Sequence, residues 1–282
     1  TLKGKGYKIA EENKENWHWC MPFDKETGKC KVSSDGESYD SLTCDYMMDK
    51  MKKDRSVVTI TAAVPTSIGF TKEAGRQFID VGIAEEHAVA MASGLAKNGC
   101  KPVFATHSSF FQRTYDQISQ DLCINSNPAT LLVNTASVYG MNDVTHLGIY
   151  DIAMMSNIPN LVYLAPTNCE EYFAMLDWAV EQKDHPVAIR VPATGVATSG
   201  RPVDADYSTL NRYEVTEKGS KVAILALGDF YTLGEETAEL LKKSGIHVTL
   251  INPRFITGLD SELLENLKAE HSMVVTLEDG VL

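Results

Sequence analysis

The sequence of 282 residues lacks the features that mark several large classes of protein. Its six cysteines have irregular spacing and form no C-x-x-C pair, which favours reduced thiols over a disulfide framework or a zinc site. Positive charge is scarce: 26 Lys and Arg face 38 Asp and Glu, and the net charge of −12 argues against binding to a nucleic-acid backbone. No apolar run approaches the ~18 residues that a membrane-spanning helix needs. We therefore expect a globular, cytoplasmic protein.

The short motifs of common nucleotide, metal and hydrolase sites are also missing. Neither G-x-x-x-x-G-K-[ST] nor G-x-G-x-x-G occurs, and H-E-x-x-H and G-x-S-x-G are absent too. No set of metal ligands can be assembled from local spacing, so we predict no metal site within this chain. The sequence begins at Thr1 rather than at Met, and Leu282 comes just after a predicted strand, so we expect a piece of a longer protein.

What the sequence does contain is a regular alternation of short apolar runs with amphipathic segments. Residues 1–48 are polar and are predicted to form an extended arm that leads into a helix over 41–53. Between 49 and 197 we predict strands at 57–63, 78–81, 102–106, 130–134, 161–165 and 186–191. Helices are predicted at 84–98, at 109–124, and from a capping box of Thr167 and Glu170 to about 182. This alternation predicts right-handed βαβ units and a parallel α/β sheet.

A second α/β domain is predicted over 205–282, after a linker. Its strands are expected at 222–227, 247–251 and 273–277. A helix is predicted to start at a capping box of Thr232 and Glu235 and to end at Gly245. Three strands are few for such a sheet, so we predict a truncated domain.

The most informative segment is FIDVGIAEEHA at 78–88, in which a strand delivers two carboxylates and an imidazole to the first turn of a helix. Glu85 lies on the same side of that helix as Ala88 and Leu95, so its carboxylate is predicted to face the interior. Burying a carboxylate is costly unless a partner binds it. From the residues alone, Glu85 is either a capping acid at the helix N-terminus or a functional acid.

Three further segments carry polar and aromatic side chains. HSSFFQR at 107–113 and GMNDVTHLG at 140–148 each follow a predicted strand, at the edge where ligands bind in open α/β sheets. In the first, the phenylalanines suit core packing or a ligand contact equally, and Arg113 suits an ion pair with Asp116 or Asp121. The segment WHWCMPFD at 17–24 places a histidine between aromatic residues in the arm.

Together these segments resemble the thiamine-diphosphate-dependent transketolase superfamily, and within it most closely the 1-deoxy-D-xylulose-5-phosphate synthases. The resemblance spans essentially the whole chain and is carried by KGKGY, WH…PFD, DVGIAEEHA, FFQRTYDQ, GMNDVTHLG and RFITGLD. It implies that 1–48 is the tail of a diphosphate-binding domain, that 49–197 is a pyrimidine-binding domain, and that 205–282 is part of a transketolase C-terminal domain.

The resemblance implies a transferase that decarboxylates pyruvate and adds the remaining two-carbon unit to an aldose phosphate such as glyceraldehyde 3-phosphate, in isoprenoid biosynthesis. Two alternatives stay open: ketol transfer by the C-terminal subunit of a split transketolase, and a non-catalytic module of the same fold. The implied cofactors are thiamine diphosphate and Mg²⁺. The family's G-D-G…N motif for Mg²⁺ and diphosphate does not occur here, so an N-terminal domain or subunit is expected to supply it, in a homodimer.

The resemblance also implies which residues bind the cofactor. Glu85 would bond N1′ of the aminopyrimidine ring and so activate the coenzyme. Phe110 would stack on that ring, with Arg113 and Ile83 beside it.

Five more residues are implied at the substrates. His18 and His146 would touch the donor or acceptor carbonyl and relay protons. His107, Asn142 and Arg190 fall where the family contacts the acceptor.

The sequence departs from the synthases at positions that bear on the acceptor. Thr135 stands where they carry an arginine that grips the acceptor phosphate, and Ala193 replaces a second basic residue. Asn142 replaces an expected acid, and Asp143 replaces a glycine. Arginine is the residue best suited to bidentate phosphate binding, so the resemblance predicts the reaction class and leaves the acceptor open.

Overall fold

The structure is a computed structural model that describes residues 2, 4–14, 17, 20–31, 36–65, 72–140 and 144–281, the side chains of 72–74 excepted. The chain divides into two compact units, Thr1–Ser38 and Tyr39–Leu282. None of the helices in the described part is long and apolar enough to cross a bilayer. No disulfide joins the six cysteines.

The first unit has more local structure than the extended arm that its composition predicts. It contains a short helix, α1 (Lys8–Glu12), and an antiparallel bridge between Phe23 and Cys30. The rings of Tyr7 and Phe23 pack against Trp17, with centroids 5.1 and 4.6 Å from the indole. This aromatic cluster gives the polar segment a small core.

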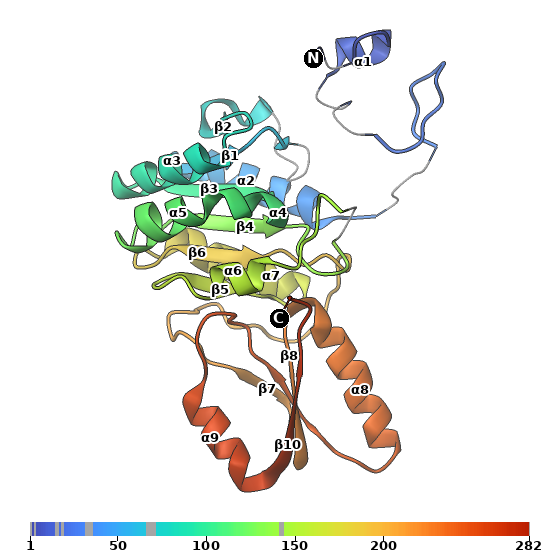
Figure 1. Cartoon of the computed structure of the whole chain (residues 1–282), viewed down its shortest axis with the longest axis vertical. Helices are drawn as coiled ribbons and strands as arrows, with labels where there is room; N and C mark the ends of the chain where they lie inside the picture. The colour runs from blue at the N-terminus through green and yellow to red at the C-terminus, as the bar shows by residue number, and fades with distance from the viewer. Residues whose placement is uncertain are drawn as a thin grey trace. The chain divides into compact units, whose positions relative to one another are not determined.

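The second unit begins with a six-stranded parallel sheet, which confirms the predicted α/β class. Its strands run in the order β2-β1-β3-β4-β6-β5 (Figure 1). They are β1 (Val57–Thr61), β2 (Phe78–Asp80), β3 (Lys101–His107), β4 (Thr130–Asn134), β5 (Val162–Leu164) and β6 (Val187–Arg190). Five of the six are buried almost throughout, because helices cover both faces of the sheet.

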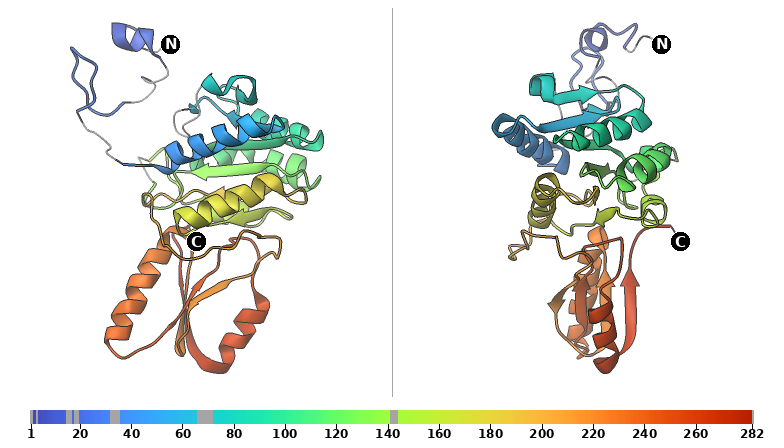
Figure 2. Two further views of the ribbon diagram at one scale, coloured as in Figure 1. Left: turned by 180° about the vertical axis from the view of Figure 1, so that it is seen from behind. Right: turned by 90° about the vertical axis from the view of Figure 1, so that its left-hand side faces the viewer.

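Helices α2 (Tyr39–Lys53) and α7 (Cys169–Glu181) pack on one face of this sheet, and α3 (Glu85–Lys97) and α6 (Asp151–Met155) on the other (Figures 1 and 2). The predicted capping box at the start of α7 is wrong in detail. Asn168 is the N-cap and accepts from the Glu171 backbone N–H at 2.9 Å, while the Glu171 carboxylate accepts from Thr167. The box is therefore shifted by one residue.

The helix predicted over 109–124 is present, but it is not a regular α-helix. The chain forms one α-helical turn, α4 (Ser108–Phe111), then a 3₁₀ turn, the short helix α5 (Tyr115–Gln117) and a π-helical turn over Ile118–Cys123. Hydroxyl groups compete for backbone carbonyls here: Thr114 donates to the Phe111 carbonyl oxygen at 2.8 Å. The apolar period survives the irregularity, which is why the sequence predicts a regular helix.

The second sheet has four strands rather than the three predicted. They are β7 (Glu214–Glu217), β8 (Lys221–Ala226), β9 (Thr249–Asn252) and β10 (His271–Leu277), in the order β10-β8-β9-β7. The missed strand, β7, is a short polar edge strand that pairs antiparallel with β9. Helix α9 (Ser261–Glu270) was not predicted either.

Helix α8 (Tyr231–Lys243) starts earlier than its predicted capping box. Phe230 occupies the N-cap position without a side-chain hydrogen bond, because a 3₁₀ turn over Gly228–Phe230 leads straight into the helix. Thr232 therefore lies inside the first turn of α8.

The two sheets are joined by backbone and side-chain contacts. Leu164 of β5 forms an antiparallel bridge with Phe255, which follows β9. The Asn252 side chain donates to the buried carboxylate of Glu171 on α7 at 3.0 Å. These contacts place the carboxyl end of β9 beside the edge strand β5 and helix α7 of the first sheet.

Candidate active site

Two of the predicted site residues, and the threonine that stands in place of the family's arginine, lie at or just beyond the carboxyl ends of strands in the first sheet. Glu85 comes five residues after the end of β2, His107 is the last residue of β3, and Thr135 follows β4. Because β2, β1, β3 and β4 are parallel neighbours, these residues lie at one edge of the sheet. The turn into α3 is fixed by Asp80, whose carboxylate accepts from the backbone N–H groups of Gly82 and Ala63 at 2.9 Å.

Glu85 is buried, as its place on the helix predicts, with 1% of its surface exposed. Its Oε1 accepts a hydrogen bond from Arg113 Nη1 at 2.5 Å. Its Oε2 is buried and has no hydrogen-bond partner among the described residues. The carboxylate therefore makes no capping bond here, and it carries an unused acceptor in a dry position.

Arg113 is the partner of Glu85 rather than of Asp116 or Asp121. Its side chain is 47% exposed, and its guanidinium lies 5.1 Å from the centre of the Phe110 ring. This cation–π contact and the ion pair together link Phe110 to Glu85.

Two imidazoles also pack against Phe110. The ring of His107 lies 5.3 Å from Phe110 and 5.6 Å from His146, and the rings of Phe110 and His146 are 5.3 Å apart. His107 Nδ1 and Thr135 Oγ1 are 2.7 Å apart, within hydrogen-bond distance. Burial, helped by nearby His146, lowers the pKa of His107 to about 4, so His107 is neutral near pH 7.

Several further polar atoms at this edge are buried without a hydrogen-bond partner among the described residues. Besides Glu85 Oε2 they are Thr61 Oγ1, Thr106 Oγ1, Ser109 Oγ and Asn134 Oδ1. They belong to the carboxyl ends of β1, β3 and β4 and to the start of α4. Buried polar atoms in native proteins are usually satisfied, so ordered water or a polar ligand at this edge would supply the missing partners.

The remaining predicted residues do not all join this group. Ile83 is 79% exposed on the turn before α3. Arg190 is buried, and its guanidinium contacts the carboxylates of Asp151 and Asp279. His18 and Asn142 lie outside the described residues.

The sequence reasoning missed Asp279, which pairs with Arg190 across 89 positions of the chain. An acid in the short LEDG segment after β10 carries no local signal of that partner. Only the fold brings the two residues together.

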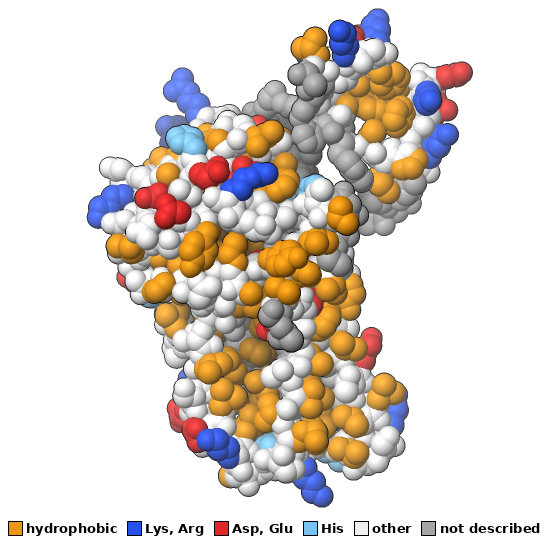
Figure 3. Space-filling view, viewed as in Figure 1, with side chains coloured by type: hydrophobic (Ala, Val, Ile, Leu, Met, Phe, Trp, Pro, Cys, Tyr) orange, Lys and Arg blue, Asp and Glu red, His pale blue; other side chains and the backbone are white. Residues whose placement is uncertain are grey.

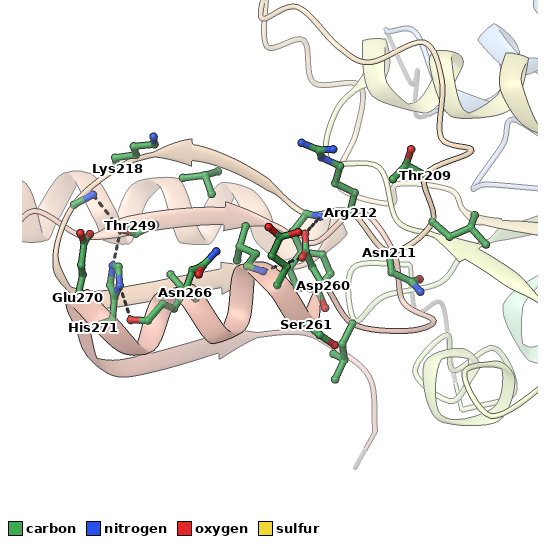
Figure 4. A pocket seen from close by; sticks show the side chains of 18 residues that line it. Thr209, Asn211, Arg212, Lys218, Thr249, Asp260, Ser261, Asn266, Glu270 and His271 are labelled. Carbon is green, nitrogen blue, oxygen red and sulfur yellow. Dashed lines mark hydrogen bonds between the residues drawn. The ribbon is translucent and has the colours of Figure 1, made fainter.

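A separate cavity of about 870 Å³ lies in the second sheet, against β7 and α9 (Figure 4). Its polar groups bond to one another: His271 contacts Thr249 Oγ1 at 2.7 Å, and Asp260 accepts from the backbone of Tyr213 and Leu263. It contains none of the predicted site residues.

Two known protein-family domains match this chain, one for each of its two sheets. The transketolase pyrimidine binding domain matches residues 40–197, and the transketolase C-terminal domain matches residues 211–282. A solved structure described as a split gene transketolase, inactive beta4 tetramer, superposes with a TM-score of 0.72 at 24% identity, covering 86% of this chain and 79% of that one. At that identity the likeness shows a shared fold.

Curated relatives that match essentially the whole of this chain are named 1-deoxy-D-xylulose-5-phosphate synthase. The relative from Alkaliphilus oremlandii is 39% identical over 284 residues, which cover 99% of this chain and 45% of the relative. The relatives from Clostridium tetani and Heliobacterium modesticaldum are 37% and 39% identical and are covered to 46% and 44%. The chain thus spans less than half the length of these relatives.

Proposed function

Because this chain belongs to the transketolase family, we propose that it carries the pyrimidine-binding part of a thiamine-diphosphate site in a transferase of the 1-deoxy-D-xylulose-5-phosphate synthase type. The observation that carries this proposal is Glu85 Oε2, a buried acceptor without a partner among the described residues, at the carboxyl edge of the sheet. The proposed domains are 1–48 for the tail of the diphosphate-binding domain, 49–197 for the pyrimidine-binding domain and 205–282 for the partial C-terminal domain.

The residues at this edge fit the aminopyrimidine of thiamine diphosphate. A carboxyl group held at Oε1 by Arg113 leaves Oε2 to share a proton with a ring nitrogen, and Phe110 offers an aromatic face beside it. When bound, thiamine diphosphate supplies a nucleophilic carbon for the keto group of pyruvate. Glu85 would hold the proton at N1′, and Arg113 would fix the orientation of the Glu85 carboxylate.

The two imidazoles beside Phe110 are proposed to serve the substrates. His146, with His18 from the arm, would move protons at the donor or acceptor carbonyl. His107 is neutral near pH 7, so it would offer the acceptor a hydrogen bond rather than a positive charge. Asn142 and Arg190 are proposed at the acceptor by resemblance alone; the burial of Arg190 between two aspartates gives that role no support.

We propose that the diphosphate and Mg²⁺ are held by an N-terminal domain or subunit, in a homodimer. Large apolar side chains are exposed beside the site, and a partner surface that covers the site would bury them. They include Ile83 at 79%, Val144 at 87% and Tyr139 at 54% exposure. Ile83 precedes Glu85 by two residues, and Val144 precedes His146 by two.

The acceptor is proposed to be an aldose or aldose phosphate. Arg113 and Arg190, the described arginines in the predicted site, both contact carboxylates, and Thr135 is bonded to His107. These contacts support an acceptor held by hydrogen bonds at this edge more than by arginine–phosphate pairs.

Titration of thiamine diphosphate and Mg²⁺ into this chain, with and without the diphosphate-binding part, tests the proposal. We expect binding only when that part is present, followed by CO₂ release from pyruvate. Failure to bind the coenzyme in both arrangements would overturn the proposed function.

A further inference from the structure

The loop that carries His146 is held closed by contacts between its own two limbs. It connects β4 to α6 and is described over 135–140 and 144–150. Gly148 packs so closely on the start of the loop that an added Cβ would lie 2.0 Å from the Thr135 carbonyl oxygen. Within the first limb, Gly140 folds back on Ala136, whose carbonyl oxygen would lie 2.3 Å from an added Cβ. The position of His146 therefore depends on how these two limbs meet.

A segment from the second sheet holds both limbs at once. After β10 the chain returns to the first sheet, and its end lies at the junction of the two sheets (Figure 1). Asp279 Oδ2 accepts from the backbone N–H of Val138 on the first limb at 3.2 Å. The backbone N–H of Val281 donates to the Ile149 carbonyl oxygen on the second limb at 2.8 Å. Residues 279–281 thus bridge the loop.

Arg190, at the end of β6, ties this bridge to the first sheet. Its Nη1 pairs with Asp279 Oδ1 at 2.5 Å, and its Nε pairs with Asp151 Oδ2 at 2.8 Å. Its Nη2 donates to the Gly148 carbonyl oxygen at 3.3 Å. The side chains of Arg190, Asp151 and Asp279 are at most 2% exposed. Because water does not solvate these charges, each is stabilised mainly by the opposite charge beside it.

We propose that Asp279 is a positioning residue: through Val138 and Arg190 it fixes the loop that carries His146, so that the second sheet controls the geometry of the site on the first. The inference rests on the proposed function, because it assigns His146 to the reaction. Asp279 contacts the first limb directly, through Val138, and the second limb through Arg190, which donates to the Gly148 carbonyl oxygen. None of these hydrogen bonds involves α3 or α4, which carry Glu85 and Phe110. The removal of Asp279 should therefore affect turnover without affecting the binding of the coenzyme.

The test compares two buried carboxylates in the protein assembled with its diphosphate-binding part. Asp279→Asn removes the charge that faces Arg190. Glu171→Gln is the matched control, since Glu171 is also buried and also joins the two sheets, through Asn252, without touching the loop. For each variant we would measure hydrogen exchange of the amides of 144–150, the dissociation constant of thiamine diphosphate, and kcat and KM for CO₂ release from pyruvate.

Asp279→Asn is expected to speed exchange in 144–150 at least tenfold and to lower kcat at least tenfold, with the coenzyme dissociation constant within threefold of the parent. Glu171→Gln is expected to lower the melting temperature without these effects. Unchanged exchange in Asp279→Asn, or an equal fall of kcat in Glu171→Gln, would overturn the inference.

A conservative variant keeps the test decisive if Asp279→Asn does not fold. Asp279→Glu retains the charge for Arg190 but displaces the carboxylate from Val138, so the same faster exchange and lower kcat are expected in a folded protein. Exchange at the parent rate in that variant overturns the inference. If the parent protein releases no CO₂ while exchange responds as expected, the proposed function fails and the role of Asp279 in holding the loop stands.

Discussion

Arg113 holds one oxygen of the buried Glu85 carboxylate and leaves the other without a hydrogen-bond partner among the described residues. A structural ion pair in a dry position usually satisfies both oxygens, because an unsatisfied buried acceptor costs about 1–3 kcal/mol. The arrangement sets the orientation of the carboxylate while keeping Oε2 available. It is therefore better suited to binding a ligand than to stabilising the fold.

The first prediction concerns that oxygen. Glu85→Gln, in the protein assembled with its diphosphate-binding part, is expected to lower CO₂ release from pyruvate at least about a hundredfold, since an amide cannot hold the proton that the carboxyl group shares. Glu86→Gln is the matched control, because Glu86 is the next residue and is exposed. Steady-state assays of both variants check the prediction, and equal activities would contradict it.

The second prediction concerns pH. The pKa of His107 is lowered to about 4 in the folded protein, below the value near 6.5 expected when unfolded, so the unfolded chain binds the proton more readily. The free energy of unfolding is therefore not reduced by His107 above about pH 6.5, and it falls as the pH drops toward 4. By pH 5 this loss amounts to about 2 kcal/mol.

Asp40 changes stability in the opposite direction over a similar range. Burial raises its pKa to about 6, so stability increases as the pH falls through 6. Denaturant unfolding of the parent and of His107→Gln at pH 7, 6 and 5 isolates the histidine. The parent should lose more stability than the variant on acidification, and parallel curves would count against a buried, neutral His107.

The third prediction concerns the acceptor. Thr135→Arg would place a guanidinium beside His107 at the edge of the sheet. It is expected to raise kcat/KM for a phosphorylated aldehyde about tenfold relative to the same aldehyde without phosphate, because arginine binds phosphate in a bidentate manner. Thr135→Gln breaks the same hydrogen bond without adding charge and should leave the ratio unchanged. A similar ratio in all three proteins would place the phosphate elsewhere.

The fourth prediction uses one substitution at two glycines. Gly148→Ala is expected to destabilise the protein by at least about 2 kcal/mol, since the new Cβ would lie 2.0 Å from the Thr135 carbonyl oxygen. Gly94→Ala, on α3 where nothing lies within 4 Å of an added Cβ, should instead stabilise it by about 0.5–1 kcal/mol. Thermal unfolding of both variants checks the prediction. A change in melting temperature of the same sign in the two variants would contradict it.

The architecture of the first sheet was predictable because burial on both faces leaves a strong local signal. A short apolar run between turn residues, such as TLLVN at 130–134, predicts a buried strand. The polar strand β7 carries no such run. Its antiparallel pairing with β9 depends on the tertiary structure and leaves no local signal in the sequence. The π-helical turn over Ile118–Cys123 was missed because its apolar spacing still resembles that of an α-helix.

The candidate site was predictable in part for the same reason. The burial of Glu85 follows from the spacing of apolar residues on α3, and that prediction is confirmed. That Arg113 pairs with Glu85 rather than with Asp116 or Asp121 could not be decided by spacing alone, since the choice depends on where α4 begins. The roles of His107 and His146 remain predictions, although the structure brings their rings together with Phe110.

Strand β10 has a consequence for handling the protein. It is one of the two edge strands of the second sheet formed by the described residues, and Met273 and Val274 on it are 57% and 51% exposed. The surface of this part of the molecule carries many hydrophobic side chains (Figure 3). An open strand edge with apolar side chains is a template for pairing with other chains. We therefore expect this polypeptide, expressed by itself, to self-associate as its concentration rises, and we expect Met273→Lys to improve its solubility.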